Sequence, residues 1–169
     1  MKNLFKLVLL SLVATIVVAC ASTEKKLAVP YIVEISASPD SNQSNGRPSP
    51  IKVVVYELSS SDAFNQTDFF TLQQDYRKVL GDQVLGVKSV ILSPGETKEL
   101  KFSGSLNSKH IGVIGYYKEF NSSKWRLLVD LPEAKSTNIY KFWQRSPKSA
   151  RIRIQAGAKE LVVLPPETK

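Results

Sequence analysis

The sequence predicts a single all-β domain, an antiparallel β-sandwich with a short helical insertion after its second strand. Three observations lead to this fold class. Short stretches with apolar side chains at alternate positions recur along the chain, which is the pattern of half-buried strands. Polar loops rich in Pro, Gly and Asn separate these stretches, and only one stretch shows helical spacing. The length of 169 residues and the apolar content of 43% suit one domain with its own core.

The chain begins with a segment that is typical of a secretory signal peptide. Lys2 and Lys6 lie at the start, and the apolar run Leu7–Val18 follows them. As a helix this run would extend about 18 Å, which is too short to cross a hydrocarbon core of about 30 Å. Ala19 supplies the small residue that precedes a cleavage point. We therefore expect residues 1–19 to be a lipoprotein signal peptide that is removed.

Cys20 is the only cysteine in the chain and directly follows the sequence Val-Val-Ala at residues 17–19. One Cys closes no intramolecular disulfide, and one Cys with one His supplies too few ligands for a zinc site of these side chains. The four residues resemble the bacterial lipobox, in which the Cys carries the acyl chains and begins the mature protein. An incidental free Cys is the alternative. We expect Cys20 to be lipidated, because it occupies the one position that a lipobox requires.

The residues after Cys20 predict where the lipidated chain resides. Bacterial lipoproteins resemble one another in carrying three acyl chains, and more than one chain makes anchoring stable. Ala21 stands where an Asp is the usual inner-membrane retention signal in enteric-type bacteria. We therefore expect the inner leaflet of the outer membrane, facing the periplasm. Residues 20–28 are polar and charged, which favours a lipidated tether before a β-sandwich domain at residues 29–169.

The first two predicted strands flank a long polar loop. Residues 30–38 and 51–58 alternate apolar side chains, and the second stretch is partly apolar on both faces, as expected for an inner strand. Residues 39–50 contain three prolines, and Asp40, Asn42, Asn45 and Gly46 favour turns. The loop is longer than a hairpin needs, and loops of this length are often functional.

A change of period after the second strand predicts the helical insertion. Four apolar side chains recur at helical spacing on one face: Phe69, Leu72, Tyr76 and Leu80. Thr67 is a candidate N-cap, and Gly81 suits the C-terminus of the helix. Packing of the apolar face against the sandwich is favoured over the alternative, an exposed docking stripe of Phe69, Phe70 and Tyr76.

The remaining chain alternates as further short strands. We expect these strands at residues 87–92, 98–102, 111–117, 125–131, 152–154 and 161–164. Residues 93–96 have Pro and Gly placed for a type II turn between two of them. Residues 140–144 form either a short strand or a helical turn. The sandwich is thus expected to contain seven or eight strands, and no internal repeat or second domain is found.

A series of motifs resembles one family of bacterial lipoproteins. The motifs are GRPSPIKVVVYEL at residues 46–58, Phe64, DFF at 68–70, Leu72, VLGD at 79–82 and LSPGE at 92–96. In their order and spacing they are similar to the outer-membrane lipoprotein of the type VI secretion system, the TssJ (VasD or SciN) family. The resemblance covers the lipobox and residues 30–165, nearly the whole mature chain.

This resemblance implies a transthyretin-like sandwich with a structural role, no enzymatic activity and no cofactor or metal. Members of the family anchor the type VI membrane complex to the outer membrane by their acyl chains. Their periplasmic domain binds the periplasmic region of the inner-membrane protein TssM, an IcmF-like protein, and the loop between the first two strands is implicated in that binding. The resemblance therefore implies TssM contacts by Asp40, Asn42, Gln43, Asn45, Gly46 and Arg47. Arg47 is the strongest candidate, because Arg anchors interfaces more often than Lys does.

The charge of the chain is compatible with an acidic partner. The net charge is +8, and it falls to +6 when Lys2 and Lys6 leave with the signal peptide. Export from the cytoplasm argues against nucleic acid as a partner. Basic residues concentrate in the last third of the chain: Lys141, Arg145, Lys148, Arg151 and Arg153. They indicate either a solvated face or a surface for an acidic partner.

Catalytic motifs and a ligand-binding role are the other functions to consider. His110 has no evident partner in the sequence and makes no recognisable triad with Ser105, Ser108 or Asp130. No glycine-rich phosphate loop occurs. The alternative function is that of a periplasmic lipoprotein that carries or binds a small apolar ligand between its sheets. An apolar cavity of several hundred Å³ would favour that alternative.

Overall fold

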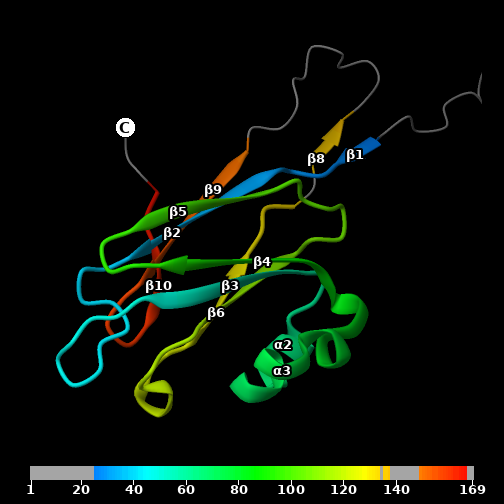
Figure 1. Ribbon diagram of the computed structural model, residues 1–169. Coiled ribbons are helices and arrows are strands. Elements are labelled where there is room, and N and C mark those ends of the chain that lie inside the picture. The colour runs from blue at the N-terminus through cyan, green and yellow to red at the C-terminus, as the bar shows by residue number, and fades with distance from the viewer. Residues whose placement is uncertain (1–24, 134, 138–148, 167–169) are drawn as a thin grey trace, which may run out of the picture. The chain divides into compact units, whose positions relative to one another are not determined.

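The computed structural model describes residues 25–133, 135–137 and 149–166. Two four-stranded sheets form most of it (Figure 1). Sheet 1 has the order β10-β9-β2-β5, with strands Leu161–Leu164, Ala150–Ala156, Tyr31–Ala37 and Thr97–Phe102. Sheet 2 has the order β4-β3-β6-β7, with strands Val84–Leu92, Ile51–Leu58, His110–Gly115 and Arg126–Asp130. The predicted fold class is confirmed.

Strand pairing departs from the expected pattern at one place in the sandwich. β2 and β9 run parallel, with Val33 opposite Ile152, whereas every other described pair within the two sheets is antiparallel. A separate two-stranded sheet pairs β1 (Lys25–Leu27) with β8 (Lys135–Thr137). β1 therefore lies within the segment that composition predicted to be only a tether.

The core between the two sheets comes from alternate residues of their strands. Val33 and Ile35 of β2 pack with Ile51, Val53 and Val55 of β3, and all five are fully buried. The other face of β3 is buried as well, because Val54, Tyr56 and Leu58 pack under the helical insertion. Burial on both sides explains why this stretch of the sequence is apolar on both faces.

The helical insertion covers the outer face of sheet 2 and consists of two helices. α2 (Asp62–Gln66) was not expected, and α3 (Phe69–Leu80) occupies the predicted helix. Asp68 is the N-cap of α3, with its Oδ1 accepting from the Thr71 amide at 3.0 Å, while the expected cap Thr67 instead ends α2. A 3₁₀ turn, η1 (Gly81–Gln83), follows α3.

Gly112 in sheet 2 leaves the space in which the helical insertion packs closely against the sheet. Phe64 of α2 is fully buried, and a Cβ built at Gly112 of β6 would lie 2.6 Å from the Phe64 ring. Any larger residue at 112 would have to displace this ring. Leu72 and Leu80 of α3 are buried in the same layer, which confirms the predicted packing of the helix against the sandwich.

The predicted strands differ from those observed mainly at their ends. β4 begins at Val84, three residues before the expected start at 87, and β9 extends to both sides of the expected 152–154. The stretch 140–144 lies outside the described residues. The 3₁₀ turn η2 (Phe120–Ser122) connects β6 to β7 and was not predicted.

The sandwich has two ends of different character. We call the end where Val29 leads into β2 the tether end; it also contains the loop 103–109 and Leu131–Pro132. The loop end lies at the other end of β2 and contains the loops 38–50, 116–125 and 157–160 (Figure 1). β2 has seven residues, so about 23 Å separates the two ends.

Candidate functional site

The predicted contact loop, residues 38–50, ends in an exposed hairpin tip at the loop end. The Ser44 and Arg47 backbones exchange hydrogen bonds of 3.1 and 3.0 Å. Asn45 and Gly46 between them have φ values of 50° and 74°, which are typical of a type I′ turn. Asn45, Gly46 and Arg47 are all exposed. The structure thus presents three of the predicted contact residues to solvent on a tight turn.

Asn42 occupies the base of this loop and is only 2% exposed. Its Nδ2 donates to the Pro50 carbonyl at 2.7 Å, and its Oδ1 accepts from the Lys118 amide at 2.8 Å. Its φ of 47° is one that Asn tolerates better than most residues. The hydrogen-bonding groups of Asn42 are therefore used within the chain, where they hold the loop, and are not presented to a partner.

Three of the loops at this end are joined into one surface, and the turn 93–96 also lies at this end, where the Gly95 amide donates to the Ala37 carbonyl at 2.9 Å. The backbone amides of Asn42 and Gln43 donate to the carbonyl oxygens of Gly157 and Ala158 at 3.2 and 3.1 Å. The Ser44 hydroxyl donates to Glu119 at 2.6 Å. The base of the loop 38–50 is consequently fixed by its neighbours, and its exposed tip projects from a rigid support.

The loop end has charges of both signs. Cations lie on each of the three loops: Arg47, Lys118, Lys124 and Lys159. The same loops contain the carboxylates Asp40, Glu119 and Glu160; Lys124 pairs with Glu160 at 3.0 Å, and the predicted contact residue Asp40 accepts from the Ser38 hydroxyl at 2.5 Å. Four cations and three carboxylates leave no large excess of either sign, so the charge of this end does not by itself select an acidic partner.

An aromatic cluster beside these loops was only partly anticipated. It consists of Phe69, Phe70, Tyr116, Phe120 and Trp125. Phe69 is buried, as its helical spacing indicated, but Phe70 is 62% exposed. The helical spacing predicts that Phe69 is a packing residue. Its contacts with the loop 116–125 depend on the tertiary fold, so the sequence did not predict them.

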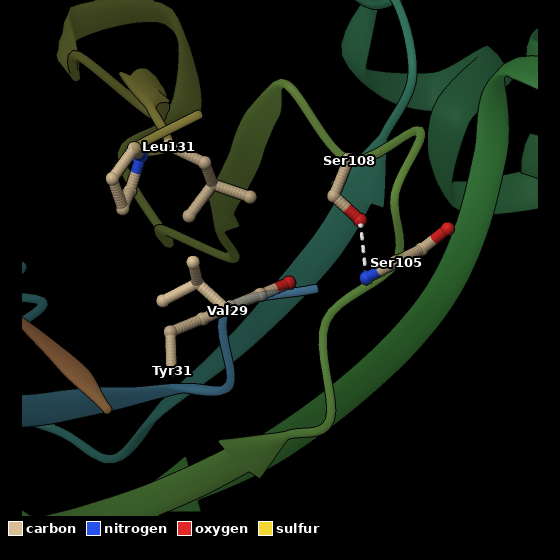
Figure 2. Close-up of a pocket in the computed structure, with 6 residues that line it drawn as sticks. Val29, Tyr31, Ser105, Ser108 and Leu131 are labelled. Carbon is tan, nitrogen blue, oxygen red and sulfur yellow. Dashed lines mark hydrogen bonds between the residues drawn. The ribbon is translucent and has the colours of Figure 1, made fainter. Parts of the chain in front are cut away.

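The tether end contains a small, closed pocket. Figure 2 shows Val29, Tyr31 and Leu131 around it, with the Ser105 amide donating to the Ser108 hydroxyl at 3.0 Å. Its volume of about 10 Å³ leaves room for at most one water molecule. A ligand site normally has several hundred Å³, so this pocket does not support the alternative of a bound apolar molecule. A larger, open pocket of about 440 Å³ lies along α3, η1 and β4, with Tyr76, Arg77, Asp82 and Leu85 in its lining. Its lining comes from these three elements alone, so it is not a cavity between the sheets.

A buried carboxylate lies close to this pocket. Glu57 of β3 is only 7% exposed and accepts a hydrogen bond from the Ser108 hydroxyl. Burial, together with the negative charge of Glu57, raises the pKa of the Tyr31 phenol above its ordinary value. Tyr31 is therefore neutral throughout the physiological range, and Tyr31 and Glu57 are both buried at the tether end.

Two other polar groupings are accounted for by contacts within the chain, one by a hydrogen bond and one by ion pairs. His110, whose partner the sequence did not reveal, lies 2.8 Å from Asp130 on the neighbouring strand. Arg151 and Arg153 both bind Glu34, at 2.7 and 3.0 Å, and the hydrogen bond from Arg153 is the main reason that the pKa of Glu34 is lowered. Part of the predicted basic surface is thus neutralised within sheet 1. Lys141, Arg145 and Lys148 lie outside the described residues.

The described part of the chain lacks the features of a metal site and of a membrane-spanning helix. No group of three potential metal ligands occurs in it. No helix among the same residues is both long enough and apolar enough to cross a membrane. The predicted lipidation site, Cys20, lies outside the described residues.

The chain is similar to proteins of one secretion system. The family model described as type VI secretion lipoprotein (VasD, EvfM, TssJ) matches residues 30–159. The structure of Serratia marcescens Lip, described as a membrane-bound component of the type VI secretion system, is 34% identical to the chain. The match covers 82% of this chain and 99% of that chain, with a TM-score of 0.71.

Two further solved structures share the fold at lower identity. The lipoprotein TssJ1 of Pseudomonas aeruginosa is 22% identical, with a TM-score of 0.71 over 84% of this chain and 99% of that one. A chain in a structure described as the type VI membrane complex is 21% identical, with a TM-score of 0.65 over 83% of this chain and 100% of that one. The comparison with curated proteins gives no match.

Proposed function

The chain belongs to the type VI secretion lipoprotein family, whose members are structural components of the secretion apparatus, and we propose that it tethers the membrane complex to the outer membrane. In this proposal residues 1–19 are removed and Cys20 is acylated. The acyl chains lie in the inner leaflet of the outer membrane, and residues 20–28 connect them to the domain in the periplasm. The domain binds the periplasmic region of TssM and performs no catalysis.

The observation that carries this proposal is the separation of the two ends of the sandwich. Cys20 precedes Val29 by nine residues, which span at most about 32 Å. The exposed tip of the loop 38–50 lies at the opposite end, about 23 Å further along β2. A chain held by its acyl group can therefore present the tip to a partner that approaches from the periplasm.

Bivalent attachment is the mechanism that this arrangement supports. The acyl chains hold one end, since each buried methylene contributes about 0.8 kcal/mol and several chains make release negligible. The tip residues Asn45, Gly46 and Arg47 contact TssM, with Arg47 as the charged anchor. Confinement at the membrane raises the effective concentration of each partner for the other.

Membrane attachment is tested by the substitution Cys20→Ser. The variant is expected to move from the membrane fraction to the soluble periplasmic fraction and to abolish type VI secretion. Secretion that persists with a soluble variant would show that anchoring is not its role.

The contact by the loop is tested with a matched pair of charge removals at the two ends. Arg47→Ala is expected to weaken binding of the purified TssM periplasmic region about tenfold in a calorimetric titration. Lys109→Ala removes an exposed cation at the tether end and is expected to leave the affinity unchanged. Equal affinities for the two variants would remove the loop from the proposed interface.

A further inference from the structure

The loop 103–109 presents an apolar side chain at the tip of a turn at the tether end. The Ser108 amide donates to the Ser105 carbonyl at 3.2 Å, and the Ser105 amide donates to the Ser108 hydroxyl at 3.0 Å (Figure 2). These two bonds close a turn that has Leu106 and Asn107 at its tip. Leu106 is 54% exposed. A leucine on a closed turn has less conformational entropy to lose when another surface buries it.

This turn lies beside the point where the expected tether enters the domain. A Cβ at Gly104 would overlap the carbonyl oxygen of Val29, so the loop passes directly against that residue. Leu106 follows Gly104 by two residues, which span at most about 7 Å. Cys20 precedes Leu27 by seven residues, which span at most about 25 Å. An acyl anchor on Cys20 therefore keeps this end of the domain near the membrane surface.

Two further exposed leucines belong to the same end. Leu27 lies just before the domain enters β2, and Leu85 lies at the start of β4. Leu58 pairs with Val84, and its carbonyl accepts from the Lys109 amide at 2.9 Å, which joins the start of β4 to the loop that contains the turn. Leucine is one of the residues that membrane-surface segments bury at the boundary between headgroups and acyl chains.

The charges near the turn have both signs. Lys109 is exposed on the loop, and its carbonyl accepts from the Leu131 amide at 2.8 Å. Asp130 and Glu133 are exposed on either side of Leu131. Attraction to anionic headgroups therefore gives this end no strong preference, and apolar contact is the interaction that the exposed leucines offer to a lipid surface.

We propose that the tether end rests on the membrane that holds the acyl chains, with the Leu106 side chain buried in the lipid interface. The occupant of this surface is the phospholipid of the inner leaflet of the outer membrane, so the inference rests on the proposed function. Contact at this end directs the tip of the loop 38–50 away from the membrane, because the tip lies about 23 Å further along β2. The domain then faces its periplasmic partner in one orientation.

The test uses the full-length acylated lipoprotein in vesicles of phosphatidylethanolamine and phosphatidylglycerol. Cys20 is the only cysteine and is acylated in the proposed function, so Leu106→Cys supplies the single free thiol for an environment-sensitive fluorophore. Its emission is expected to shift to the blue and to fall about twofold when the lipids carry nitroxide quenchers. Ile91→Cys is the matched control, because Ile91 is 62% exposed and lies two residues before the turn 93–96 at the loop end. Its label is expected to emit as in water, and equal emission and quenching at 91 and 106 would overturn the inference.

A second label tests whether Leu106 itself makes the contact. Asn107→Cys places the fluorophore next to Leu106 on the same turn, and the added substitution Leu106→Ser is expected to remove most of its quenching. Both positions are exposed, so the melting temperature is expected to stay that of the parent. Equal quenching with and without Leu106→Ser would overturn the inference. Quenching that is lost in vesicles of phosphatidylcholine alone would overturn its apolar basis.

The possible results separate this inference from the proposed function. If the lipoprotein stays on the vesicles while the label at 106 emits as in water, the inference is wrong and anchoring stands. If the unsubstituted chain takes up the fluorophore at Cys20, acylation is wrong and both proposals fail. If the blue shift at 106 occurs without quenching by the nitroxide lipids, a contact between copies of the chain covers Leu106 and the inference is overturned.

Discussion

The two ends of the sandwich differ in which side chains they bury and which they expose. At the tether end, Tyr31 and Glu57 are buried, and the Ser108 hydroxyl bonds the Glu57 carboxylate. At the loop end, Arg47 is exposed on a hairpin tip and Phe70 is exposed on a packed helix. The buried carboxylate thus lies at the end where the chain comes from its expected anchor, and the exposed hairpin tip lies at the other end. In the proposed function, attachment and recognition are separated by about the length of a strand.

The loop end is itself divided into a rigid base and an exposed tip. The base is held by the buried Asn42, and the tip turns at Asn45 and Gly46. A fixed base reduces the entropy that the tip loses when a partner binds. Pairs of substitutions at similar residues can measure how differently the tether end, the loop base and the tip respond in stability.

The largest difference is expected between two glycines with the same φ. Gly104 and Gly46 both have φ of 74°, but a Cβ at Gly104 would lie 2.3 Å from the Val29 carbonyl oxygen, whereas one at Gly46 meets nothing within 4 Å. Gly104→Ala should lower the free energy of unfolding by about 3 kcal/mol or more, and Gly46→Ala by about 1 kcal/mol. Urea denaturation measures both. Equal losses would show that the tether end is not tightly closed.

The second comparison concerns two asparagines of one loop. Asn42→Gly preserves the positive φ but leaves the Pro50 carbonyl and the Lys118 amide without their partner. It should cost about 2–3 kcal/mol of unfolding free energy. Asn45→Gly, at a φ of 50° on the exposed tip, should change stability by less than about 0.5 kcal/mol. Thermal melts of both variants check this, and a stable Asn42→Gly variant would contradict the assignment of Asn42 to the base.

Two serine–glutamate hydrogen bonds give a smaller contrast. Ser108→Ala removes the donor to the buried Glu57 and should cost about 1–2 kcal/mol, because a buried carboxylate loses a partner. Ser44→Ala removes the donor to the exposed Glu119 and should cost about 0.5 kcal/mol or less. The denaturation midpoints of the two variants measure which hydrogen bond contributes more to stability. A larger loss for Ser44→Ala would reverse the proposed contrast between the ends.

The smallest effect is expected midway between the ends, on sheet 1. Hydrogen bonds from Arg153 and Arg151 lower the pKa of Glu34 below its ordinary value of 4.5 in the folded state. The ionised Glu34 therefore stabilises the fold above that pH, and the contribution is lost as the pH falls through the lowered folded pKa. Glu34→Gln should be less stable than the parent near neutral pH by under about 1 kcal/mol. The difference should shrink in melts below pH 4; a difference independent of pH would exclude the ion pairs as its cause.

Sequence patterns predicted the regular elements better than the way in which they pair. Alternation in residues 51–58 predicted an inner strand, and β3 is buried on both faces. The helical period of Phe69, Leu72 and Leu80 predicted their common packing face. The parallel pairing of β2 with β9 joins strands more than one hundred residues apart, and no local pattern specifies such a partner.

The predicted contact loop shows the same limit at the level of single residues. Its Pro, Asn and Gly residues predicted an irregular loop with turns, and the turn at Asn45–Gly46 follows from that chemistry. The composition did not distinguish Asn42 from Asn45, although one is buried and the other exposed. The distinction depends on Lys118 and Gly157, which are distant in sequence and meet Asn42 only after the sheets assemble.

The sequence by itself determined the predicted signal peptide and lipobox, the sandwich class and the family, because each depends on local order, spacing or periodicity. Only the tertiary structure decided which loops share an end, which Asn is buried and that Phe70 meets Phe120. Those features depend on contacts between segments remote in the chain. Such contacts form because the assembled fold as a whole buries apolar surface and satisfies hydrogen bonds. The sequence of one segment therefore does not predict them.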